Sequence, residues 1–146
     1  MYDDDADEVI HRAGTTEAGA LSWLACADGT DDDGVSRFVA STGSVDRMGD
    51  VVEQSWRLAN YRRNPVILLE HMVPVVGRGT VKIDRERDAL LLSVEWDDSD
   101  ENPVGKLIAS QHRRGFRGAV SVGFRPGRTI SRTKLPEDHA ARVSGD

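Results

Sequence analysis

The sequence predicts a mainly β protein of the α+β class, with a compact closed or nearly closed barrel of about six or seven strands and a few short helices. Three observations support this fold class. Short apolar or alternating segments recur along the chain, separated by acidic or turn-forming residues. Two segments are predicted as short helices, and few βαβ units are evident, so a barrel fits better than a doubly wound sheet.

The chain divides into three predicted parts. Residues 1–18 are polar and without periodicity, so we expect a disordered tail or a leader. Residues 19–130 hold the strand-like segments and form the predicted barrel domain. Residues 131–146 are polar, and we expect the chain to be truncated there before a final strand.

The predicted strands follow one another closely. Segment 21–27, which contains Cys26, is joined to segment 36–42 by an acidic, glycine-containing loop. Segment 66–69 is continuously apolar, which is typical of a strand buried on both faces. The remaining predicted strands are 75–83, 89–96 and 117–125.

Two helices are predicted between these strands. Residues 54–63 mix apolar and polar side chains, and Pro65 ends this short helix because the residue before a proline is pushed out of the helical region. Residues 103–114 are the better candidate, since their apolar side chains recur at helical spacing. Ser99 or Asp100 can cap the start of this helix, and Gly115 ends it.

Composition excludes several classes of function. A net charge of -6, from 19 basic and 25 acidic residues, argues against nucleic acid as the main partner. No apolar run approaches the roughly 20 residues that span a bilayer, and the start lacks the order of a signal peptide, so we expect a soluble protein of a reducing compartment. The single Cys26 excludes an internal disulfide and is expected to be a small buried side chain. No metal or cofactor site is predicted.

Charge is unevenly distributed along the chain. Acidic residues crowd the first eight positions and the segment 31–33, whereas the stretch 113–132 is net basic. Such blocks usually belong to solvated tails and loops, and an electrostatic docking role is the alternative.

Two residues have surroundings suited to chemistry. His71 follows the apolar segment 66–69, where a titratable group can be held rigidly and still reach solvent; a structural histidine is the alternative. Ser121 lies among small residues between Gly118 and Gly123, which allow close approach of a substrate backbone; a serine in a glycine-containing strand is the alternative. A Ser/His pair from separate strands is chemically sound.

The other histidines are expected to be solvated or at a helix edge: His11, His112 and His139.

Four sequence blocks together resemble the prohead maturation proteases of tailed bacteriophages, over roughly residues 20–126. Both their order and their spacing agree with that family. The blocks are STGSVDRMGDVV (41–52), NYRRNPVILLEH (60–71), VGRG (76–79) and GAVSVGFRP (118–126).

This resemblance implies a serine endopeptidase with a β-barrel like that of the herpesvirus assemblins. It places the nucleophile at Ser121 and the general base at His71. Main-chain amides near the serine, or a water held by an arginine, would stabilise the oxyanion. Arg125 is a candidate for this arginine, and a structural ion pair is the alternative. The implied substrates are scaffold and major capsid protein precursors and the protease itself, inside the procapsid in the host cytoplasm. Self-association is also implied, with no nucleic-acid or membrane partner.

The third catalytic residue is expected, by the same resemblance, in a further apolar strand that the chain to Asp146 does not contain. The candidate substitutes are Glu137, Asp138, His139 and Asp146. Two alternatives to a protease follow from this missing residue. The first is a catalytically silent barrel that docks on capsid or scaffold protein. The second is a generic small barrel that binds a ligand.

Overall fold

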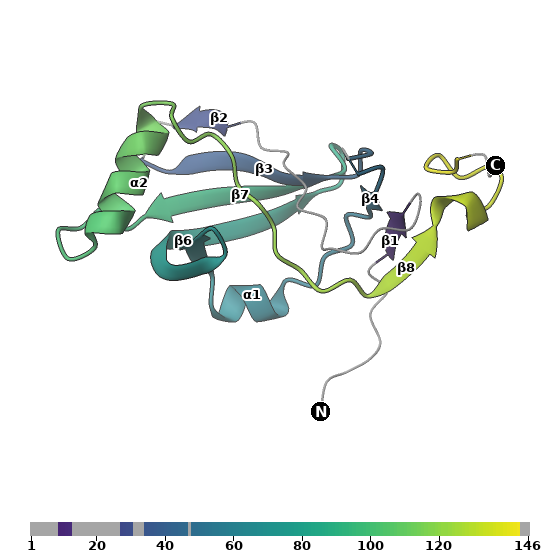
Figure 1. The fold of residues 1–146 in the computed structure, drawn as a ribbon, viewed down its shortest axis with the longest axis horizontal. Helices are drawn as coiled ribbons and strands as arrows, with labels where there is room; N and C mark the ends of the chain where they lie inside the picture. The colour runs from purple at the N-terminus through teal and green to yellow at the C-terminus, as the bar shows by residue number, and fades with distance from the viewer. Residues whose placement is uncertain (1–8, 13–26, 31–33, 47, 144–146) are drawn as a thin grey trace.

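The computed structural model describes residues 9–12, 27–30, 34–46 and 48–143, and these form two sheets (Figure 1). A five-stranded antiparallel sheet has the order β2-β3-β7-β6-β5, and a three-stranded sheet has the order β4-β1-β8. The strands are β1 (Val9–Arg12), β2 (Ala27–Thr30), β3 (Ser36–Thr42), β4 (Val51–Val52), β5 (Val66–Leu69), β6 (Met72–Asp84), β7 (Ala89–Trp96) and β8 (Arg128–Ser131). The helices are α1 (Ala59–Arg63), α2 (Pro103–Arg113) and the 3₁₀ helix η1 (Arg132–Lys134).

The larger sheet is open, so the predicted barrel is wrong. Strands β2 and β5 are its two edges, and no strand pairing joins them in the described part of the chain. The predicted strand 117–125 forms no ladder there; it crosses the face of the sheet instead (Figure 1). The physical reason is that Val120 and Val122 pack their side chains onto the core, which leaves the backbone away from a strand edge.

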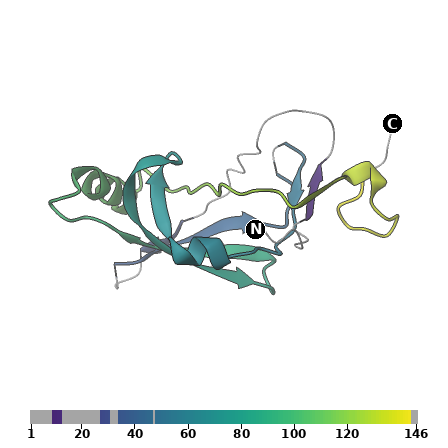
Figure 2. The ribbon, with the colours of Figure 1, turned by 90° about the horizontal axis from the view of Figure 1, so that it is seen from below.

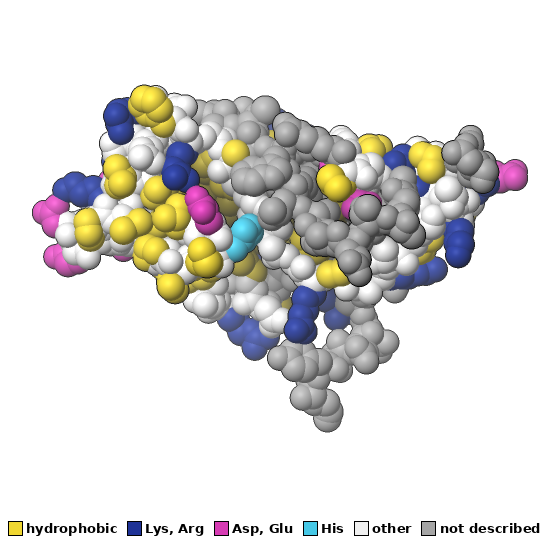
Figure 3. Space-filling model, viewed as in Figure 1, with side chains coloured by type: hydrophobic (Ala, Val, Ile, Leu, Met, Phe, Trp, Pro, Cys, Tyr) yellow, Lys and Arg dark blue, Asp and Glu magenta, His cyan; other side chains and the backbone are white. Residues whose placement is uncertain are grey.

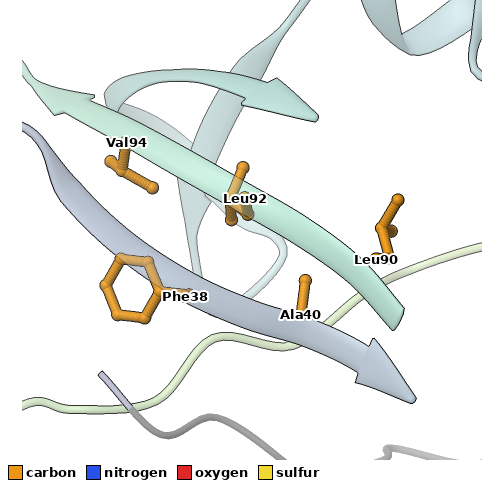
Figure 4. Close-up of a cluster of buried hydrophobic side chains, with 5 residues drawn as sticks. All are labelled: Phe38, Ala40, Leu90, Leu92 and Val94. Atoms are coloured by element: carbon orange, nitrogen blue, oxygen red, sulfur yellow. The ribbon is translucent and has the colours of Figure 1, made fainter. Parts of the chain in front are cut away.

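The core covers one face of this sheet. The pairing of Phe38 with Leu92 and of Ser36 with Val94 places alternate residues of β3 and β7 on the same side. The indole nitrogen of Trp96 donates a hydrogen bond of 2.7 Å to the buried Ser36 hydroxyl, so this polar group is satisfied. Five buried side chains form the centre of the core (Figure 4): Phe38, Ala40, Leu90, Leu92 and Val94.

Helix α2 rests on the same face. Its cap is Asn102, whose side chain accepts a hydrogen bond from the Gly105 amide; this role was predicted for Ser99 or Asp100. Gly115, with φ of +79°, follows the helix as predicted. The ring of His112 is buried against Phe38 and Trp96, with centroid distances of 5.1 and 5.4 Å, although we expected it at the helix edge.

Local patterns predicted other elements with mixed success. Strands 36–42 and 89–96 are confirmed, and the predicted strand 75–83 is extended in both directions as β6. The predicted helix 54–63 shortens to α1, because the Gln54 amide group bonds the Val52 carbonyl and the Ser41 hydroxyl in the core. Residues 21–26, with Cys26, lie outside the described residues.

The ends of the chain also contribute strands. β1 lies within the stretch 1–18, which was expected to be a tail, and β8 extends past the predicted domain boundary at residue 130. Buried Arg132 joins this end to the rest of the molecule by donating hydrogen bonds of 2.6 and 2.7 Å to the carbonyls of Ala141 and Gly49. No helix in the described ranges is long and apolar enough to cross a membrane.

Gly79 of β6 lies directly beneath α1, and replacing it by alanine should destabilise the fold. An added Cβ would lie 2.3 Å from the Tyr61 hydroxyl and 2.8 Å from Leu92 Cδ1. We expect Gly79→Ala to lower the free energy of unfolding by about 1–3 kcal/mol in urea titrations. Gly118→Ala is the matched control, since an added Cβ there meets nothing within 4 Å. Adding Tyr61→Phe to Gly79→Ala should restore part of the lost free energy of unfolding, because it removes the hydroxyl nearest the new Cβ. An equal loss of stability in Gly79→Ala and Gly118→Ala would contradict this packing.

Candidate functional site

His71 lies at the tip of the β5–β6 hairpin. Because Leu69 pairs with Met72, the connection consists of Glu70 and His71 alone. Their φ angles are +51° and +60°, so both residues have left-handed backbone, as in the type I′ turns that usually contain Asn and Gly. Such strain in residues other than glycine is concentrated at functional sites. The turn therefore fixes the backbone from which the His71 side chain projects and leaves this residue exposed.

Irregular pairing bends this hairpin out of the sheet. Ile67 pairs with Gly77, Leu68 with Val75 and Leu69 with Met72, so β6 carries extra residues just after the turn. Such bulges bend a strand and redirect side chains, often beside active sites. Figure 2 shows the hairpin curling toward the side on which segment 117–126 crosses the sheet. β5 is consequently a partly exposed edge strand, and the prediction that it is buried on both faces is wrong.

Segment 117–126, which carries Ser121, is anchored along its length. At its start the buried His112 ring holds the Arg117 carbonyl, with 2.7 Å between Nδ1 and the oxygen. In the middle, Val120 and Val122 pack on the core. Near its end the Phe124 ring meets the Trp56 ring edge-on, with the centroids 5.3 Å apart. Contacts on the core side thus position this segment without any strand ladder.

The hairpin tip and this segment meet at Gly123. An added Cβ at Gly123 would lie 3.3 Å from Nδ1 of His71 and 3.5 Å from its Cε1, so a larger residue would press on the imidazole. Gly123 is two residues beyond Ser121, a span of at most about 7 Å. The structure therefore brings His71 to the segment that carries Ser121.

The Ser121 hydroxyl oxygen is buried and has no hydrogen-bond partner among the described residues. Ser121 and His71 are thus not joined by a hydrogen bond in this arrangement. An unpaired buried hydroxyl costs about 1–3 kcal/mol, and such groups call for an explanation beyond folding. The Ser121 side chain or the curled hairpin has to move before the imidazole can act on this oxygen.

Exposed apolar side chains surround the hairpin tip. Met72 and Val73, which follow His71, are 65% and 84% exposed. Figure 3 shows hydrophobic side chains gathered over the end of the molecule that holds α2 and β6. The exposed apolar residues of these elements and of β5 are Leu68, Met72, Val73, Val75 and Leu107. This surface is suited to contact with apolar side chains of a peptide.

The candidates for a third catalytic residue lie elsewhere. Glu137 and Asp138 are exposed in the C-terminal segment, and the His139 ring accepts a hydrogen bond from the Ala141 amide. Figures 1 and 2 both show this segment at the opposite end of the molecule from α2 and the β5–β6 hairpin. Asp146 lies outside the described residues. Arg125, the candidate for holding an oxyanion-site water, is exposed.

Sequence reasoning missed Tyr61 of α1. Its hydroxyl is buried above Gly79 and has no hydrogen-bond partner in the described part of the chain. Burial raises the pKa of the phenol, so Tyr61 stays protonated at neutral pH. Only its place in the block 60–71 drew attention to this residue, because a tyrosine at a helical position is usually a packing residue.

Comparisons with family models, curated proteins and solved structures gave no match to this chain. Among the described residues, no group of three or more His, Cys, Asp or Glu side chains could hold a metal ion.

Replacing Glu70 by asparagine should stabilise the protein. Glu70 holds φ of +51°, a conformation that costs non-glycine residues about 1–2 kcal/mol but that asparagine tolerates well. We expect Glu70→Asn to raise the free energy of unfolding by roughly 0.5–1 kcal/mol, measured by urea denaturation. Glu53→Asn, at another exposed position outside the left-handed region, should give no such gain. A loss of stability in Glu70→Asn would mean that the glutamate side chain compensates the strain.

Proposed function

We propose that this chain is a serine endopeptidase in which Ser121 is the nucleophile and His71 the general base. One observation carries the proposal: Nδ1 of His71 lies 3.3 Å from the position that a Cβ on Gly123 would take, two residues from Ser121, whose buried hydroxyl has no hydrogen-bond partner among the described residues. A strained turn positions the base, and core contacts position the segment of the nucleophile. Rigid support of both groups is what covalent catalysis requires.

The reaction in this proposal is acyl transfer. His71 accepts the proton of the Ser121 hydroxyl while the oxygen attacks the carbonyl carbon of a peptide bond. The imidazolium then gives this proton to the leaving amine, and the acyl group stays on the serine as an ester. A water molecule, deprotonated by His71, hydrolyses the ester and restores the enzyme. The reacting oxygen and nitrogen need a separation of about 3 Å, and such pairs are often longer without substrate.

The sequence blocks extend the proposal to a biological setting. Their order and spacing support a procapsid-resident enzyme that cleaves scaffold and capsid precursor segments and itself, and that self-associates. The exposed apolar surface beside His71 fits apolar residues of such a peptide substrate.

A second candidate function is a catalytically silent module that docks on capsid or scaffold protein. Two observations favour it: Ser121 makes no hydrogen bond to His71 in the described residues, and the described candidates for a third catalytic residue lie at the other end of the molecule. The exposed hairpin surface would then bind protein without cleaving it.

Labelling with a fluorophosphonate probe separates these two functions. On the full chain, peptide mapping by mass spectrometry should find the phosphonyl adduct on Ser121. The adduct should vanish in Ser121→Ala and persist in Ser44→Ala, which removes an exposed loop hydroxyl. Absence of label on protein with a native circular dichroism spectrum, or label confined to another serine, would support the docking module and reject the enzyme.

A further inference from the structure

A second site lies at the C-terminal end of α2, next to the start of the segment 117–126 that carries Ser121. Four residues line an open cavity of about 550 Å³: Gln111, Arg114, Phe116 and Arg117. Neither the peptidase proposal nor its residues use this cavity. Three of its four residues, all but Gln111, lie in the net basic stretch 113–132.

The backbone around this cavity is held firmly. Gly115 ends the helix with φ of +79°, and its amide donates to the His112 carbonyl at 2.8 Å. The Phe116 amide donates to the Gln111 carbonyl at 2.9 Å, and the Arg117 carbonyl is held by buried His112. The side chains therefore project from a fixed turn, which lowers the entropy cost of binding a ligand.

The cationic side chains are oriented and lack acidic partners. Arg117 Nε donates to the Gln111 side-chain oxygen at 2.8 Å, and Arg114 Nε lies 3.3 Å from the Ser110 carbonyl. No carboxylate pairs with Arg114 or Arg117 in the described residues, whereas neighbouring Arg113 pairs with Asp98 at 3.2 Å. The terminal nitrogens of two guanidinium groups are thus available for a carboxylate.

An exposed aromatic ring completes the site. Phe116 is 75% exposed, and Arg114 stacks over its ring with 5.0 Å between Cζ and the centroid. A large apolar side chain so exposed beside oriented arginines matches the residue types that dominate binding surfaces. The ring offers an apolar contact next to the two charges.

We propose that this cavity binds an acidic peptide segment of a partner protein, with a carboxylate on Arg114 and Arg117 and an apolar side chain on Phe116. A polyanionic nucleic acid relies on many clustered cations, whereas this cavity offers the two arginines Arg114 and Arg117. Two oriented guanidinium groups suit the planar, bidentate geometry of a carboxylate.

Fluorescence anisotropy with a labelled peptide, Ala-Asp-Glu-Phe-Asp-Glu-Ala, tests this proposal on the full chain. We expect saturable binding that weakens as salt is added. Arg114→Gln and Arg117→Gln should each weaken binding about 10-fold or more, as the loss of a charge-assisted contact predicts. Phe116→Ala should weaken binding as well. Arg113→Gln is the matched control, because Arg113 is already paired with Asp98, and should change affinity by roughly twofold at most.

Three results would overturn the proposal. The first is equal binding of a peptide in which Asn and Gln replace the acidic residues. The second is equal weakening by Arg113→Gln and Arg117→Gln. The third is tighter binding of single-stranded DNA than of the acidic peptide, which would assign the cavity to another class of partner. These measurements read binding alone, so their outcome is independent of whether the chain cleaves peptides.

Discussion

Replacing His71 by asparagine should lower the rate of fluorophosphonate labelling at Ser121 by about 10³-fold or more, with little loss of stability. The rate should fall because the serine hydroxyl is a weak nucleophile without an adjacent base, and removal of one member of such a catalytic group costs several powers of ten. The fold should survive because asparagine tolerates the left-handed backbone that His71 holds, with φ of +60°. Time courses of adduct formation by mass spectrometry give the rate, and urea titration gives the stability.

Two control variants make this prediction specific. His139→Asn removes an imidazole from the exposed C-terminal segment and should leave the labelling rate unchanged. Glu70→Asn changes the neighbouring position of the same turn and should retain labelling, so it separates a changed turn from a lost base. Undiminished labelling of Ser121 in His71→Asn would show that another group activates the serine, and His71 would then have only a structural role.

Local patterns in the sequence predicted those elements whose structure depends on local contacts. Alternation along 36–42 and 89–96 corresponds to one buried face of β3 and β7, and helical spacing in 103–114 corresponds to α2. The same alternation in 117–125 predicted a strand that does not form. Val120 and Val122 bury their side chains as a strand would, yet no ladder forms in the described residues. Burial of alternate residues therefore does not establish strand pairing, and the barrel prediction failed at this point.

The candidate site was only partly predictable for a related reason. The sequence gives the order of apolar segments, but a Glu-His pair does not indicate the tight left-handed turn that it forms, since Asn and Gly are the usual residues there. The bulges that curl the hairpin depend on its pairing with β6, which periodicity does not reveal. The burial of His112 was missed because its partners, Phe38 and Trp96, come from distant strands.

Phe38→Ala should be the most destabilising substitution in the core, with a loss of about 3–5 kcal/mol in the free energy of unfolding. The Phe38 ring is 3% exposed and contacts the rings of both Trp96 and His112, so alanine leaves a cavity between the sheet and α2. Urea denaturation measures this loss. Val45→Ala is the control, because Val45 is 50% exposed, lies outside the β5–β6 hairpin and should change stability by no more than about 0.5 kcal/mol.

The same substitution should also affect Ser121 through His112. The His112 ring packs on Phe38 and holds the Arg117 carbonyl at 2.7 Å, so it links the core to the start of the segment that carries the serine. Loss of the Phe38 ring allows the imidazole to move, and the anchored position of segment 117–126 is then lost at one end. We therefore expect slower fluorophosphonate labelling of folded Phe38→Ala at low temperature, where Val45→Ala labels like the parent chain. Destabilisation with an unchanged labelling rate would show that the contacts of Val120, Val122 and Phe124 suffice to position the serine.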